Sequence, residues 1–581
     1  MRKAKIARLL SMSIFATAIF GAAAYADATN INVGTQEDWY TALATMHQST
    51  NSEFTITLTD DINITAAINS QQIDNKNTVT IIGKGHSLTF NVDAGRINVS
   101  DATLNLGRNG QSDVLKIKGA GPTGNSSNSL IFLHTDAVLN MYANTELSDN
   151  YHDHGALTGG GVLMYDNSIF NMYGGSIHDN AVQTWGGAIC MDYVNGAEFH
   201  MYDGEIYNNT VDDYYGGAIV IGYGSSSTID IQGGTIRNNS APYGGAITIS
   251  SASTNSSAII KNATIKDNVG TGTNGAGQAN GGAGGIIVDG GTLTIENSVI
   301  EGNTYNGKGT GGIRSDSTLI SKNNIYRNNT STYYGGAIEI ADSNGFGSTF
   351  TSTNDKIYGN SAMIGGGVFL LQGTADLSTT EVYNNKASYA GNDYFINSSV
   401  ASAKIIPAAN MTGYATYGST ETNLENWYRD AGTRFDVDNP TAVVDPANIV
   451  AGSQYALTAA GKVVYTIKFN TAGGSAVDDI KVIVGETATA PTDPTKDGYV
   501  FKGWYTDNTY ETEFDFTASV TANATAYAKW EEAPAPDPTP GPESVPTSTP
   551  ENPSTHDDIM SYVVTFAISV LGLGVAFIIK R

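Results

Sequence analysis

The sequence is poor in cysteine and in basic residues. Among 581 residues there is one cysteine, Cys190, so no intramolecular disulfide can form and no cysteine cluster can bind zinc or an iron–sulfur centre. Its apolar surroundings predict a small buried residue. Lysine and arginine number 30 against 56 aspartates and glutamates, a formal net charge of −26. This balance argues against a nucleic-acid-binding protein, which needs basic patches to displace counterions.

Helical periodicity is scarce in the middle of the chain. The apolar residues alternate there over short stretches, and glycine and asparagine separate the stretches, which is typical of short strands joined by turns. A hydrophobic content of 40% is enough for a core, so general disorder is not expected.

Both ends of the chain indicate export. Residues 1–26 combine a basic start, an apolar stretch and a small-x-small cleavage site, which predicts a signal peptide. Residues 559–579 form a run of 21 residues without charge, long enough for a transmembrane helix. Lysine and arginine at 580–581 follow it and predict a cytoplasmic tail. The bulk of the chain is therefore expected at the cell surface.

The segment before this helix, residues 532–558, predicts an extended stalk, because eight of the fifteen prolines fall between 534 and 553. Within it, Asn552, Pro553, Ser554 and Thr555 precede the hydrophobic span and the basic tail. This arrangement resembles a Gram-positive sortase sorting signal of the NPxT type. The resemblance implies a sortase partner that transfers the Thr555 carbonyl to the cell wall. His556 stands where glycine or asparagine is usual, and plain membrane anchoring is the alternative.

Residues 147–391 contain an internal repeat of two alternating motifs, with spacings between 25 and 35 residues. The first motif is an apolar residue followed three positions later by asparagine. Its copies are Leu147…Asn150, Ile177…Asn180, Ile206…Asn209, Ile236…Asn239, Ile265…Asn268, Ile300…Asn303, Ile325…Asn328, Ile357…Asn360 and Val382…Asn385. The second motif is a Gly-Gly pair followed by apolar alternation. Those pairs begin at 160, 186, 216, 244, 284, 311, 335 and 366.

A repeat of about 29 residues made of short strands predicts a right-handed parallel β-helix. One repeat forms about one coil, the first residue of the asparagine motif points into the lumen, and stacked asparagines can bond between coils. With weaker copies before the array, residues 54–400 give roughly twelve coils. Residues 27–53, which include an amphipathic stretch, and 401–463, which include 422–435, are expected to cap the ends.

The Gly-Gly motif reads GGAI at 186–189, 216–219, 244–247 and 335–338. Its alternation with the asparagine motif resembles the repeat of chlamydial polymorphic membrane proteins. The resemblance covers about 245 residues and implies a β-helical surface passenger, often an adhesin.

Residues 464–531 differ from the array. They closely resemble a Listeria–Bacteroides repeat, the B-repeat of internalin-type proteins. The matching residues are Phe469, Gly473, Gly474, Pro491, Pro494, Gly498, Tyr499, Phe501, Gly503, Trp504, Tyr505, Phe516, Tyr527, Lys529 and Trp530. The resemblance implies a small β-grasp-like module that acts as a spacer or a weak binding unit.

Candidate chemistry is sparse. Asp212 and Asp213 form the one acidic doublet of the array and are the candidates for a pair of catalytic carboxylates. Consecutive strand residues point to opposite faces, however, so we expect these two to belong to a variable loop. His152 and His154, with His178 one motif later, suggest an exposed loop more than a metal site. We expect neither catalytic residues nor a cofactor.

Aromatic residues precede several Gly-Gly pairs, namely Trp185, Tyr215, Tyr243 and Tyr334. In register, they would form a strip on one face that could bind glycan. The alternative is stacking between coils that only stabilises the solenoid.

The sequence thus predicts an all-β chain: a parallel β-helix, a small β-grasp-like module and a C-terminal transmembrane helix. The predicted function is adhesion to a glycan or to a host or neighbouring-cell surface, without catalysis. A carbohydrate-active enzyme, a polysaccharide lyase or hydrolase, and a purely structural rod are the alternatives.

Overall fold

The computed structural model describes residues 29–49, 52–66, 72–91, 95–110, 112–121, 128–152, 159–191, 194–250, 255–274, 277–278, 281–342, 347–396, 404–406, 414–415, 427–429, 442–444, 455–459, 461–462, 464–483 and 485–532. The predicted signal peptide, most of the stalk, the sorting motif and the hydrophobic segment 559–579 lie outside these ranges. Within them, no helix is long and apolar enough to cross a membrane.

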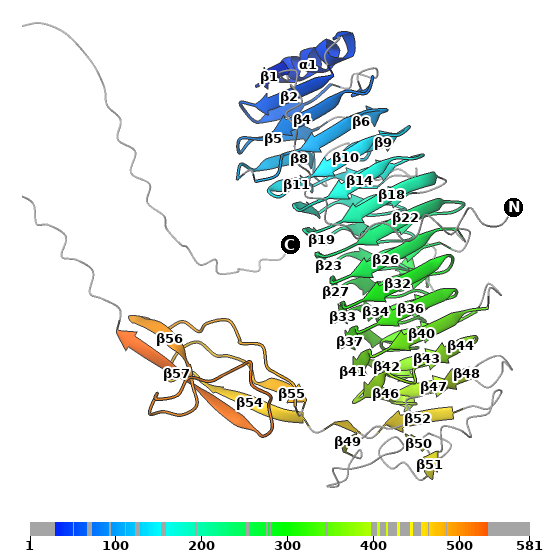
Figure 1. The fold of residues 1–581 in the computed structure, drawn as a ribbon, viewed down its shortest axis with the longest axis vertical. Helices are drawn as coiled ribbons and strands as arrows, with labels where there is room; N and C mark the ends of the chain where they lie inside the picture. The colour runs from blue at the N-terminus through cyan, green and yellow to red at the C-terminus, as the bar shows by residue number, and fades with distance from the viewer. Residues whose placement is uncertain are drawn as a thin grey trace, which may run out of the picture. The chain divides into compact units, whose positions relative to one another are not determined.

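Most of the described chain winds into a parallel β-solenoid of about 11 turns (Figure 1). Among the described residues, the turns build four parallel sheets, which we name A to D. In one turn, β18 (Asn195–Met201) belongs to sheet A, β19 (Glu205–Tyr207) to sheet B, β20 (Thr210–Val211) to sheet D and β21 (Ile219–Ile221) to sheet C. The predicted all-β parallel solenoid is confirmed.

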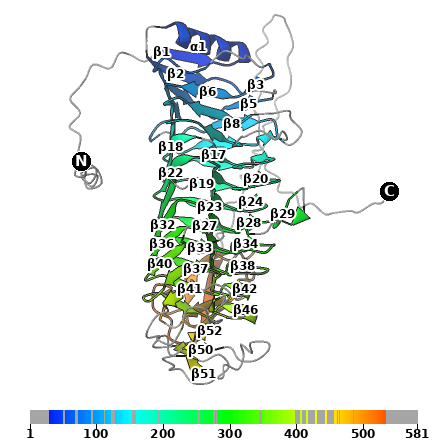
Figure 2. The same ribbon diagram turned by 90° about the vertical axis from the view of Figure 1, so that its right-hand side faces the viewer.

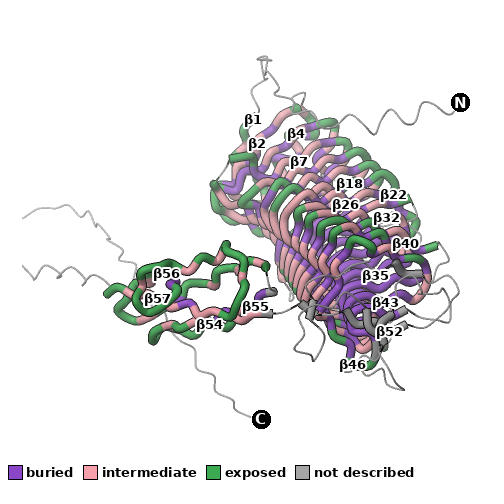
Figure 3. Tube along the Cα trace, turned by 60° about the horizontal axis from the view of Figure 1, so that its bottom comes forward, coloured by how far each residue is buried: buried purple, intermediate pink, exposed green. Residues whose placement is uncertain are grey.

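The lumen is filled by apolar side chains that stack in register. Phe170, Phe199 and Ile229 of successive sheet A strands occupy one register position, and all three are fully buried. Strand side chains alternate between the two faces of a sheet, so every second residue enters this core. The inward positions form one continuous buried cluster along the solenoid (Figure 3).

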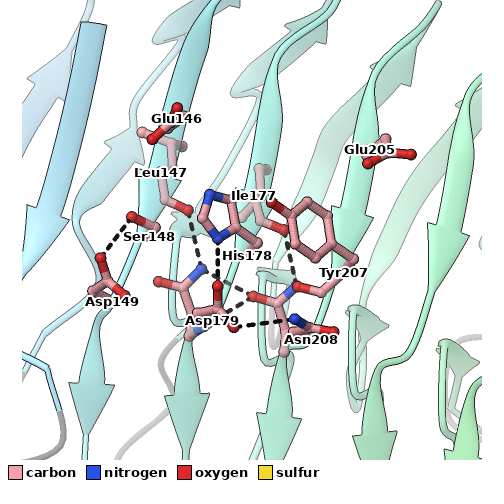
Figure 4. Close-up of polar contacts among 12 residues, drawn as sticks. Glu146, Leu147, Ser148, Asp149, Ile177, His178, Asp179, Glu205, Tyr207 and Asn208 are labelled. Atoms are coloured by element: carbon pink, nitrogen blue, oxygen red, sulfur yellow. Dashed lines mark hydrogen bonds and ion pairs between the residues drawn. The ribbon is translucent and has the colours of Figure 1, made fainter. Parts of the chain in front are cut away.

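A ladder of buried asparagines runs along the corner between sheets B and D. Each side-chain amide donates to the next side-chain carbonyl at 2.8–3.0 Å, from Asn180 to Asn385, and the last one donates to Asp393. The residue before each ladder asparagine takes the left-handed conformation, as Asn208 does at φ 55°. Figure 4 shows this corner beside Leu147, Ile177 and Tyr207. The predicted asparagine stacking is confirmed.

One copy of the motif was misaligned in the sequence prediction. In that coil the lumen residue is Tyr326, paired with Ile300 and Ile357, and the ladder residue is Asn329. The tyrosine is tolerated in the core because its hydroxyl lies 2.7 Å from Ser321 Oγ. The predicted pair Ile325…Asn328 is therefore wrong by one position, and a shift of one residue moves a side chain to the other face.

The N-terminal end is closed by α1 (Gln36–Gln48), which packs on the first turn. Its N-cap, Thr35, forms a reciprocal capping box with Asp38, and Trp39, Leu43 and Met46 are buried against the core. These residues are the buried face of the amphipathic stretch that was expected to cap this end.

The C-terminal end of sheet C is continued by antiparallel strands. The strand β47 (Tyr394–Ile396) pairs with β52 (Tyr455–Ala459), β52 with β50 (Trp427–Arg429), and β50 with β51 (Ala442–Val444). The predicted capping stretch 422–435 contains β50. An antiparallel addition occupies the edge that would otherwise pair with other chains.

The segment after the solenoid contains a small mixed sheet, ordered β55 (Ile480–Ile483), β54 (Val464–Asn470), β57 (Ala524–Glu532), β56 (Tyr499–Tyr505). Trp504 is 6% exposed and meets Phe469 edge to face, which confirms it as a core residue. The described part of this segment contains no helix, so the grasp-like arrangement stays a prediction.

Candidate ligand-binding face

The outward residues of sheet C are buried beneath a layer of side chains. The middle residue of each strand points away from the lumen, and these residues stack in register. They are Leu163, Cys190, Val220, Thr248, Ile287, Arg314, Glu339 and Phe369. All are at most 7% exposed. Cys190 is among them, as expected for a small buried residue.

The Gly-Gly pairs bring the covering layer close to the sheet. A Cβ atom on Gly187 would lie 2.1 Å from the carbonyl oxygen of Gly217 in the next turn, which no side chain permits. The residue before each pair can therefore fold over sheet C. Trp185 and Tyr215 do so and pack on Leu163, Cys190 and Val220.

Three of the four predicted strip residues come together. Trp185 and Tyr215 stack with ring centroids 5.3 Å apart, and Tyr215 and Tyr243 with centroids 4.7 Å apart. Tyr334 lies in a separate stack, 4.7 Å from the Phe369 ring. The aromatic face thus has two segments. We call the stack of Trp185, Tyr215 and Tyr243 the aromatic strip.

Stacking uses most of the ring faces within the strip, so the neighbouring tyrosines offer the free surface. Tyr214 lies parallel to Trp185 at 5.7 Å and is 44% exposed. Tyr223 meets Trp185 edge to face at 6.1 Å and is 40% exposed. Tyr214 directly precedes the strip residue Tyr215 in the sequence, whereas Tyr223, in the turn after β21, was not found from the sequence.

A cluster of charged residues lies between the two aromatic segments. Arg314 donates to Asp289 at 2.7 Å, its other terminal nitrogen is 2.5 Å from Asp316, and its Nε lies 3.9 Å from Glu339. Thr310 donates to Glu339 at 2.6 Å. Asp289 is the most accessible member, with 19% of its side chain exposed.

A Gly-rich insertion, residues 270–285, lengthens one coil and contributes to the burial of the charged cluster. It forms a hairpin of β29 (Thr273–Asn274) and β30 (Gly277–Gln278), and Figure 2 shows β29 projecting from the solenoid. A Cβ on Gly281 would lie 3.7 Å from the guanidinium carbon of Arg314, so the end of the insertion covers the cluster.

Burial dominates the electrostatics of the cluster. Desolvation, opposed by Arg314 and reinforced by Asp316, raises the pKa of Asp289 to about 6. Desolvation also raises the pKa of Glu339. Desolvation opposes the charge of Arg314, but the attraction of the carboxylates is larger, so the Arg314 pKa is raised and the guanidinium stays charged.

Asp289→Asn is expected to change how the stability of the solenoid depends on pH. Folding raises the Asp289 pKa from its ordinary 3.8 to about 6. Asp289 therefore contributes most to the stability of the folded solenoid at acid pH, where its carboxyl group is protonated. The contribution is lost as the pH rises through about 6. As the pH rises from 4.5 to 7.5, the free energy of unfolding of the variant, measured relative to that of wild type, should increase by about 1–3 kcal/mol. Denaturant titrations at both pH values measure this, and an unchanged difference would contradict it.

The other candidate residues that the structure describes lie at separate positions. Asp212 is exposed and Asp213 half-buried at the corner that leads into the strip. Burial, followed by the charge of Asp213, raises the pKa of Asp212. His178 lies 2.6 Å from Asp179 and stacks on Tyr207 (Figure 4). The side chains of His152 and His154 lie outside the described residues.

Among the residues that the structure describes, no group of three or more histidine, cysteine or acidic side chains is arranged to hold a metal ion.

The charged cluster is the feature that the sequence interpretation missed. Asp289 and Asp316 each directly follow a sheet C strand, β31 (Ile286–Val288) and β35 (Ile313–Ser315). They are therefore one coil apart, and an alignment of the repeats would have placed them side by side.

Comparison with known proteins agrees with this architecture. Residues 203–387 match the family of right handed beta helix regions. Residues 465–529 match the Listeria-Bacteroides repeat domain. Together the two matches support a surface β-helix protein. The matches leave the resemblance to chlamydial repeats and the sortase signal as predictions.

Two curated relatives come from Evansella cellulosilytica. One, provisionally named a Gly-rich membrane protein, is 33% identical over 109 residues, which is 19% of this chain and 12% of that protein. The other, provisionally named a membrane protein, is 44% identical over 69 residues, which is 12% of this chain and 10% of that protein. The similar segments therefore span about a tenth of each relative.

Proposed function

We propose that this chain is a surface-anchored adhesin whose aromatic strip binds a glycan without catalysis. The observation that carries the proposal is the pair of exposed rings, Tyr214 and Tyr223, held against Trp185 on one face of a rigid solenoid. Flat rings supply apolar contact area for a ligand that is polar at its edges. The rest of the chain presents this face: the β-grasp-like module and the stalk act as spacers, and residues 559–579 anchor the protein in the membrane or, after cleavage at Thr555, in the cell wall.

The absence of catalysis is part of the proposal. A glycosidase holds its two carboxyl groups about 5–9.5 Å apart, with the sugar between them. Asp289 and Asp316 instead contact the same guanidinium, at 2.7 and 2.5 Å from its nitrogens. This arrangement supports a binding role over hydrolysis.

The double variant Trp185→Ala with Tyr214→Ala is expected to lose glycan binding. The purified chain is incubated with a panel of polysaccharides, and retained protein and new sugar chain ends are both measured. We expect at least a tenfold loss of affinity for the retained glycan, since one aromatic contact is worth about 1.4 kcal/mol.

The matched control is Tyr202→Ala. Tyr202 is 45% exposed and stacks on Tyr173, away from the strip, so its loss should leave binding unchanged. Equal losses in both variants would contradict the assignment of the strip. New chain ends would favour an enzyme, and no retention would favour a structural rod.

A further inference from the structure

The aromatic strip lies next to an excess of negative charge. In the charged cluster three carboxylates surround one guanidinium, which leaves a charge of −2 when all four groups are ionised. Burial raises the pKa of the Tyr215 phenol, and the charge of the nearby Asp289 carboxylate raises it further. The negative charge of the cluster is therefore felt at the aromatic strip.

A second source of negative charge adjoins the strip at Tyr214. Asp212 and Asp213 immediately precede Tyr214, and Asp212 is exposed. Among the described residues, the positive charge within the cluster is that of Arg314, which already faces three carboxylates. A ligand lying on Tyr214 and Tyr223 is thus expected to meet a negative potential.

We propose that this potential makes the aromatic strip selective for uncharged saccharides over anionic ones, such as uronic-acid polymers. The inference rests on the proposed glycan binding. An anionic sugar would bring its carboxylates toward Asp212, Asp213 and Asp289, and like charges within about a Debye length, roughly 10 Å at 0.1 M salt, repel each other. A neutral sugar meets no such cost, and its hydroxyls can donate to these carboxylates.

Pairs of polymers with one backbone and different charge test the selectivity. Hydroxyethylcellulose is compared with carboxymethylcellulose, highly methyl-esterified pectin with polygalacturonate, and chitin with carboxymethyl-chitin. Each is immobilised, and binding of the full chain is measured at 0.02 M and 0.5 M NaCl. We expect binding to the neutral member to be insensitive to salt, and binding to the anionic member to be weaker and to rise with salt.

The variants separate a local effect from the overall charge of the chain. Asp212→Asn with Asp213→Asn should raise affinity for the anionic member about fivefold at low salt, the scale of one contact repulsion of about 1 kcal/mol in water. Asp289→Asn should act in the same direction. Glu198→Gln removes a charge from the outer face of sheet A and should have no effect.

Each outcome decides the proposal. Equal binding of both members, a preference for the anionic member, or the same gain from Glu198→Gln would overturn the selectivity but leave glycan binding intact. Retention on no polymer would overturn the proposed function and the selectivity with it.

Discussion

Asn239→Ala is expected to lower the free energy of unfolding of the solenoid by about 3–5 kcal/mol, because several buried polar groups lose their partners at once. The Asn239 amide donates to Asn268 Oδ1, Ile206 O and Arg237 O at 3.0 Å each. Its carbonyl oxygen accepts from the Asn209 side chain at 2.9 Å and from the Asn209 backbone at 3.0 Å. Alanine satisfies none of these, and the site is fully buried, so water cannot replace them.

Asn171→Ala is the matched control for this loss. Asn171 donates to Asn140 at 2.9 Å in a similar amide stack, but on the partly exposed outer face of sheet A. Water can replace that bond, so the loss should stay below about 1 kcal/mol. Denaturant unfolding of both variants measures the difference, and similar losses would mean that the buried ladder does not stabilise the coils.

The fold could be predicted because the same pattern of apolar, asparagine and glycine residues recurs in successive coils. Nearly every asparagine motif found in the sequence occupies the expected corner, and in those motifs the apolar partner, such as Ile206 or Ile236, enters the lumen. The prediction failed where two asparagines are adjacent, at Asn328 and Asn329. Local pattern cannot choose between them, whereas the register with Ile300 and Ile357 can.

The candidate site was predictable only in part, for a related reason. The aromatic residues stand beside a visible marker, the Gly-Gly pair, so their common face could be inferred. Arg314 and Glu339 carry no such marker, since they occupy positions that are apolar in other coils, such as Val220 and Phe369. Three-dimensional register, together with the cover from the 270–285 insertion, turns separate charges into one buried cluster.

Arg314→Leu is expected to lower the free energy of unfolding by about 3–5 kcal/mol at pH 7.5, because it leaves buried carboxylates without their counter-charge. Asp289 and Asp316 lie 2.7 and 2.5 Å from the guanidinium, and Glu339 and Asp316 are 3% and 2% exposed. The loss is measured by denaturant unfolding.

The pH dependence distinguishes this electrostatic loss from a simple packing defect. Without the guanidinium the folded-state pKa values of these carboxylates rise further, so the folded variant takes up protons that the unfolded chain does not bind. Its deficit should therefore shrink as the pH falls from 7.5 to 5. Arg237→Leu breaks a 2.9 Å pair with Glu205 on the exposed face of sheet B and should cost less than about 1 kcal/mol at either pH. A deficit for Arg314→Leu that does not change with pH, or one no larger than that of Arg237→Leu, would mean that the cluster contributes packing and no net electrostatic stabilisation.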